Sequence, residues 1–275
     1  MRNPIDRPTA TRRWAGPHPS ARWWVILGWW VVAIMLHLLV WITLAIVLVA
    51  SGATHAITWV QLAWALGLIA HLLLAARHHG ALTTWQPSGW PVGRRGLALG
   101  AVATCWASGQ LLHLAGADVQ TTSGSQGIHD TLHLVVVVLL LVLVMPVLEE
   151  LLCRGLVLRN LVRSGAGTTA AVLLSSVLFA LPHGGWVPII TTFVLGLSLA
   201  ALVRETGSLV WVVLTHIALN LLVLLQGVLL VPATRELLAG QPTTAVVAWL
   251  GLAAGLAWSL ALVRTGTLEP GRTGA

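Results

Sequence analysis

Two adjacent glutamates and an arginine interrupt one of the most apolar parts of this chain. Glu149, Glu150 and Arg154 follow directly on the apolar run 132–147. A charged side chain deep in a bilayer costs roughly 2.5–3.5 kcal/mol on insertion scales. Three charged residues at such a place therefore need partners, water or a chemical role.

The composition indicates a membrane protein. Hydrophobic residues make up 57% of the 275 residues and charged residues 8%, a balance outside the range of soluble globular domains of this length. The formal net charge of +7 comes from 15 arginines without a lysine. Because the arginines lie near the ends of apolar runs and form no single patch, membrane orientation explains them better than nucleic-acid binding does. We expect an all-α, polytopic helical bundle in contact with membrane lipid and no nucleic-acid partner.

Apolar runs of about 20 residues, the length that crosses a bilayer, predict about eight transmembrane helices. We expect them at about 23–50, 57–76, 96–115, 131–163, 168–181, 186–203, 208–231 and 244–263. Only Gly155 interrupts the fourth, which is expected to continue past the glutamates as one long helix. The bundle is expected to fill 21–265, between a disordered cytoplasmic tail at 1–20 and a polar tail at 266–275.

The arginines also predict the orientation of the bundle. With eight spans and both termini on one side, every arginine except two falls on that side; Arg235 lies on the other side and Arg154 lies in the motif itself. Because positive residues favour the cytoplasmic face, we expect both termini to be cytoplasmic. The arginine-rich, lysine-free composition further favours a bacterial source and a multi-pass protein of the plasma membrane.

Helical spacing assigns different roles to the two glutamates. Neighbouring residues of a helix point about 100° apart, so Glu149 and Glu150 cannot face the same point. Glu150 and Arg154 are four residues apart and can form an ion pair along one face, a pair that we expect to be structural. Glu149 then has no local partner and is the candidate reactive carboxylate.

A histidine in the fifth span is expected at the same depth as Glu149. Glu149 and His183 each lie about 17 residues from the turn near 165–167, which places both about 25 Å from it. Phe179 shares a helix face with His183 if the helix persists through Pro182.

The seventh span carries the other two polar candidates. His216 and Asn220 are four residues apart and share a face. Counted from the turn near 205–207, His216 is expected nearer to that end of the bundle than His183, with Asn220 one turn deeper. Helix tilt can close much of this gap, so a cluster of Glu149, His183, His216 and Asn220 is predicted inside the bundle. The other intramembrane histidines, such as His71 and His113, are expected to be packing residues.

These residues carry a resemblance to a known family. The sequence resembles the CPBP family, which comprises the CAAX-protease and bacteriocin-processing intramembrane proteases, also called the abortive-infection family. Three motifs occur in the family's order: Glu149-Glu150-x-x-x-Arg154, Phe179-x-x-x-His183 and His216-x-x-x-Asn220. The resemblance covers about 131–226, the expected catalytic core.

The resemblance implies the function of an intramembrane endopeptidase. Glu149 and His183 would activate a water molecule for attack on a peptide carbonyl, and His216 with Asn220 would stabilise the oxyanion. The remaining motif residues would shape and orient the site: Glu150, Arg154 and Phe179.

A zinc site is the alternative use of the same side chains. One carboxylate and two imidazoles can bind zinc, here Glu149, His183 and His216, and the family was long named as metalloproteases. Because no helix carries a His-x-x-x-His pair and relatives favour a glutamate-type mechanism, we expect hydrolysis without a metal cofactor, with zinc as the alternative.

Two further functions compete with proteolysis. A bacteriocin-immunity or scaffold membrane protein could keep the same fold without catalysis, which a Glu149→Gln substitution would test. A proton-coupled transporter would place ionisable residues along a path across the bilayer, whereas this chain concentrates them near one level.

If the protein is a protease, a bacteriocin-like peptide or a membrane-protein segment is expected as its substrate, rather than a farnesylated protein. The sequence leaves the oligomeric state open.

Overall fold

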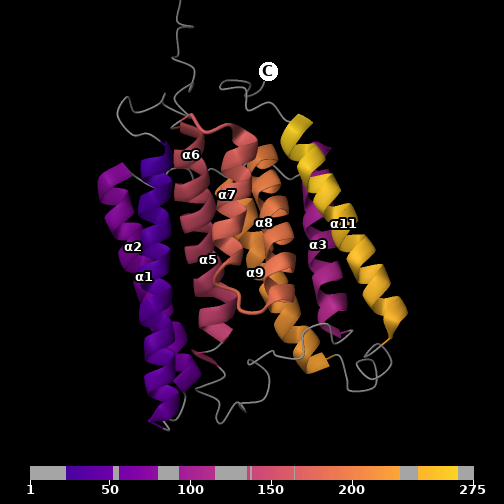
Figure 1. The fold of residues 1–275 in the computed structure, drawn as a ribbon. Helices are drawn as coiled ribbons and strands as arrows, with labels where there is room; N and C mark the ends of the chain where they lie inside the picture. Colours follow the sequence, from indigo (N-terminus) through magenta and orange to yellow (C-terminus); the bar gives the residue numbers. More distant parts are fainter. Residues whose placement is uncertain are drawn as a thin grey trace, which may run out of the picture.

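The helices of the protein lie side by side as a single bundle (Figure 1). The structure is a computed structural model that describes residues 23–51, 56–79, 93–114, 135–136, 138–163, 165–229 and 241–265. From 138 to 163, the fourth predicted span forms a rod, called the central rod below. The other seven described helices are α1 (Trp23–Ala50), α2 (Ala56–His79), α3 (Arg94–Leu114), α7 (Thr168–Ala180), α8 (Trp186–Thr206), α9 (Leu209–Leu229) and α11 (Pro242–Thr265). These bounds agree closely with the predicted spans, and the predicted tails at 1–20 and 266–275 lie outside the described residues.

From 138 to 163, the described part of the fourth predicted span is one continuous rod, although its helical type changes along its length. Its segments are η1 (Leu139–Val144), α5 (Met145–Glu150), η2 (Leu151–Leu158) and α6 (Arg159–Arg163). Both η segments are π-helical, whereas the sequence predicted an ordinary α-helix. With this rod counted once, the described residues form eight rods and no strand, which confirms the all-α bundle.

Four of the described helices are long and apolar enough to cross a membrane, namely α3, α8, α11 and the part of α9 from Leu209 to Gln226. Shorter apolar stretches occur within α1 and α2, and α7 is a short apolar helix. Together with the composition, these helices make the protein a multi-pass membrane protein.

Close packing at glycines joins the helices of one half of the bundle. Helix α8 packs against α3, α7, α9 and α11, and α3 packs along α11. Gly251 and Gly255 of α11 form a GxxxG pair, and they face Ser108 and Cys105 of α3. A Cβ atom at Gly255 would lie 2.5 Å from Cys105 Sγ, so this contact requires glycine.

Arginines tie three helices together at one end of the bundle. Arg94 binds Glu205 through two hydrogen bonds of 3.1 Å and also donates to Thr265. Arg95 donates to the Glu205 carbonyl, and Arg204 donates to the carbonyl of Val263. The start of α3 and the ends of α8 and α11 therefore lie together.

In two places, two helices pack on the same neighbouring element but hardly contact each other. Helices α2 and α7 both pack on the central rod but make few contacts with each other, and α3 and α9 both pack on α8 in the same way. Each of these two gaps holds a cleft.

Candidate active site

The glutamates sit where the central rod departs from regular α-helical geometry. Pro146 lies in the first turn of α5, directly after the π-helical η1. Proline lacks an N–H and its ring crowds the carbonyl four residues earlier, which the wider π turn accommodates. Glu149 and Glu150 end α5, and a second π-helical segment follows at once. Such segments are frequent at functional sites.

Glu150 is the buried centre of a hydrogen-bonded group. Its side chain is fully buried, as is that of Arg154, and Arg154 Nη1 lies 3.0 Å from Glu150 Oε1. This confirms the predicted i, i+4 pair. The same oxygen lies 2.9 Å from His216 Nδ1, a contact that the sequence did not predict. Because an ionised carboxylate can only accept hydrogen bonds, Nδ1 of His216 carries the proton.

Arg154 is fixed by two further contacts from neighbouring helices. Its Nη2 donates to the Gly196 carbonyl at 2.9 Å, and its guanidinium lies 4.3 Å from the ring centre of Phe179. The missing side chain of Gly196 leaves room for the Phe179 ring, because a Cβ atom at Gly196 would lie 3.1 Å from that ring. These contacts fix the Arg154 side chain in the position in which it binds Glu150. Within the described structure, Glu150 Oε2 and Arg154 Nε still have no hydrogen-bond partner.

Glu149 is the more open of the two glutamates, as the sequence predicted. Its side chain is 20% exposed, and Oε2 lies 3.9 Å from His216 Nε2. This distance exceeds a hydrogen bond, and it leaves Glu149 and the far nitrogen of His216 facing each other across a small gap.

The start of α9 explains why His216 reaches both glutamates. Leu209 lies against Gly155, where a Cβ would approach Leu209 Cδ2 to 3.4 Å. Glu149 lies six residues before Gly155 and His216 lies seven residues after Leu209, so both are about 10 Å from that contact. The sequence placed His216 nearer the end of the bundle because it could not show that α9 begins at the level of Gly155.

His183 lies just after α7, in agreement with the predicted end of the fifth span near 181. Helix α7 ends at Ala180, and His183 occupies the turn before α8. It still approaches Phe179, since His183 Nδ1 lies 3.1 Å from the Phe179 carbonyl and the ring centres are 5.5 Å apart. Phe179 also contacts the ring of His216, with the ring centres 5.6 Å apart, so Phe179 lies against both imidazoles.

Asn220 lies one turn beyond His216 on α9 and contacts the start of the central rod. Its Nδ2 donates to the Leu141 carbonyl in η1 at 2.8 Å. Among the described residues, neither Asn220 nor His183 forms a hydrogen bond with either glutamate. The structure therefore gathers Glu149, His216 and the supporting residues closely, while Phe179 connects His183 to them and η1 connects Asn220.

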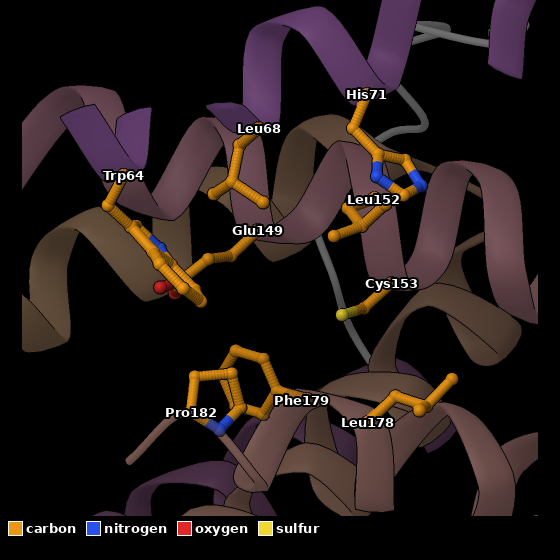
Figure 2. A pocket seen from close by; sticks show the side chains of 9 residues that line it. All are labelled: Trp64, Leu68, His71, Glu149, Leu152, Cys153, Leu178, Phe179 and Pro182. Atoms are coloured by element: carbon orange, nitrogen blue, oxygen red, sulfur yellow. The ribbon is translucent and has the colours of Figure 1, made fainter. Parts of the chain in front are cut away.

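A small apolar cleft with about 30 Å³ of free space opens beside Glu149. Figure 2 shows the Glu149 side chain extending past Trp64, between α2 and α7. Helix α2 supplies three lining residues, Trp64, Leu68 and His71; the rod adds Leu152 and Cys153, and α7 with its turn adds Leu178, Phe179 and Pro182. The sequence predicted His71 to be a packing residue, and no motif pointed to α2, whose approach to Glu149 depends on the tertiary fold.

The zinc alternative requires Glu149, His183 and His216 to meet at one point. Glu149 Oε2 and His216 Nε2 lie 3.9 Å apart, whereas the described side-chain contacts of His183 are with Phe179. No group of three His, Cys, Asp or Glu side chains in the described part of the chain is arranged to hold a metal ion.

One comparison with known proteins identifies the region that carries this site. Residues 131–222 match the family model described as "Type II CAAX prenyl endopeptidase Rce1-like". No curated protein and no solved structure matches the chain. The matched segment contains Glu149, Glu150, Arg154, Phe179, His183, His216 and Asn220. The segment 131–222 is therefore similar to the Rce1-like CAAX-type endopeptidases, in agreement with the family that its motifs resemble.

Proposed function

We propose that the protein is an intramembrane endopeptidase in which Glu149 and His183 activate the attacking water, without a metal cofactor. One observation supports this most. Two adjacent glutamates have different surroundings, since Glu150 is fully buried and bound by Arg154 and His216, whereas Glu149 lines a cleft. The first can hold the site together while the second remains available to a substrate.

Glu149 suits the role of general base. Its carboxylate faces an otherwise apolar cleft, where a bound water would have few other acceptors. Proton transfer to a well-placed side chain typically contributes about 10²–10⁴-fold to the rate. His183 can share this work, because donation from Nδ1 to the Phe179 carbonyl leaves a lone pair on Nε2.

His216 and Asn220 suit the role of oxyanion stabilisers. A protonated His216 would donate from Nδ1 to Glu150 and present Nε2–H beside Glu149, and it would bring the four charges of the cluster to a formal sum of zero. The Asn220 amide has two N–H groups, of which one is used by Leu141. Such donors are typically worth about 10²–10³-fold each.

The substrate that we propose is a bacteriocin-like peptide or a segment of a membrane protein. The cleft between α2 and α7 lies within the apolar bundle, which supports entry from the lipid phase. The arginine distribution supports a plasma-membrane protein with both termini in the cytoplasm.

Comparative proteomics tests this function directly. Membranes of cells that carry the wild type are compared with membranes of cells that carry Glu149→Gln. Glu205→Gln serves as the control, because Glu205 pairs with Arg94 at the end of the bundle. We expect at least one new peptide terminus with the wild type and the control that is missing with Glu149→Gln. Identical termini in all three samples, with full biological activity of Glu149→Gln, would favour the immunity or scaffold function.

A further inference from the structure

A second cleft, with about 280 Å³ of free space, lies between α3 and α9 over α8, outside the residues assigned to catalysis. Its lining differs from that of the first cleft because it contains several uncharged polar side chains. The lining residues that matter here are Trp106, Gln110, His113, Thr191, Thr192 and Val223.

Three of these side chains form a polar stripe on a predicted membrane span. Trp106, Gln110 and His113 are spaced by four and three residues, so they share one face of α3. Trp106 Nε1 is buried and has no hydrogen-bond partner among the described residues. A buried donor without an acceptor destabilises the folded state. The stripe thus offers hydrogen bonds that the described protein does not use.

The lining also restricts what the cleft can bind. None of the residues that line it is an aspartate, glutamate, lysine or arginine. A phosphate headgroup would find no cation there, whereas neutral donors and acceptors match the N–H and C=O groups of a polypeptide.

Two residues that line the second cleft follow shortly after catalytic residues in the chain. Val223 follows His216 by seven residues, which places it on nearly the same face of α9 about 10 Å further along. At the start of α8, Val187 lines the cleft, and it follows His183 of the preceding turn by four residues. A chain that passes the catalytic histidines can therefore continue into it.

We propose that this second cleft binds the substrate polypeptide, in extended form, on one side of the bond that is cut. This rests on the proposed function. A peptide must leave the helical state to expose its scissile bond, and in a bilayer each freed backbone group needs a partner. The stripe from Trp106 to His113 rises about 10 Å, the length of about three extended residues.

Site-specific photocrosslinking tests the proposal. The photoreactive residue p-benzoylphenylalanine replaces Gln110 in the full-length Glu149→Gln chain, which is irradiated in its native membrane. Leu178 in the first cleft is the positive control position, and Leu250, which is 65% exposed on α11, is the lipid-facing control. We expect position 110 to attach to the same polypeptide that the wild type cuts, within about ten residues of the new terminus.

The outcomes separate this proposal from the catalytic one. If position 178 captures the cleaved polypeptide and position 110 captures only lipid, the second cleft is not a substrate site, although the protein is a protease. If the wild type cuts nothing, the proposed function fails and this inference fails with it.

A kinetic measurement on the cleaved peptide gives a second test. Trp106→Phe keeps a smaller aromatic ring and removes the N–H, so KM should rise about 2- to 10-fold with kcat unchanged. Trp258→Phe is the control, because Trp258 packs against Gly100 away from the cleft. An unchanged KM for Trp106→Phe would overturn the assigned hydrogen bond.

Discussion

Replacing Arg154 by methionine should destabilise the protein strongly. Methionine keeps most of the volume and the apolar stem of the side chain but removes the guanidinium. Glu150 would then remain fully buried with His216 as its only described partner. The substitution would also leave the Gly196 carbonyl without its donor and the Phe179 ring without its cation.

The expected cost follows from these contacts. Removing one partner of a buried ion pair typically costs about 3–5 kcal/mol, because the other charge stays buried without compensation. This corresponds to a fall of about two to four powers of ten in the ratio of folded to unfolded protein. Removing both charges should cost much less, so Glu150→Gln combined with Arg154→Met should recover a large part of the loss.

Unfolding of the purified protein in mixed micelles, followed by circular dichroism, measures these differences. Wild type, Arg154→Met, Glu150→Gln and the double variant form a double-mutant cycle. A coupling near zero, or an Arg154→Met protein as stable as the wild type, would refute the view that the pair stabilises the site.

Three further predictions concern packing, catalysis and metal. Gly255→Ala should cost roughly 1–3 kcal/mol in the same unfolding assay, because its Cβ would meet Cys105 Sγ at 2.5 Å; combining it with Cys105→Ala should restore the loss. His183→Ala should lower kcat by about 10²–10⁴-fold with an unchanged fold by circular dichroism, and retained kcat would remove His183 from the mechanism. Dialysis against EDTA should leave the cleavage rate unchanged, whereas a loss that zinc alone reverses would restore the metal alternative.

Contacts within one helix could be predicted from the sequence, and so could the helices themselves. The apolar runs gave the helix positions because each must be about as long as the bilayer is thick. Glu150 and Arg154 could be paired because four residues is one turn, and the structure confirms that contact.

Contacts between helices could not be predicted in the same way, because they depend on the depth at which each helix begins in the bundle, which the sequence does not specify. The bond between His216 and Glu150 requires α9 to begin beside Gly155, which spacing along one helix cannot show. The π-helical turns on both sides of α5 could not be predicted either.

Helix α2 shows the same limit more clearly. Trp64 and His71 line the cleft beside Glu149, yet a single histidine in an apolar helix has no pattern that separates a site residue from a packing residue. Likewise, His113 was predicted to be a packing residue and instead lines the second cleft.

The most direct test of the central claim compares the two adjacent glutamates in the purified protein. The cleavage rate of the peptide found by proteomics is measured for Glu149→Gln and for Glu150→Gln, each with its folded fraction determined. If Glu149 is the base, Glu149→Gln should keep the stability of the wild type and lose at least about 10²-fold in kcat, while Glu150→Gln should lose stability as well as rate. A folded Glu149→Gln protein that cuts the peptide at the wild-type rate would contradict the account.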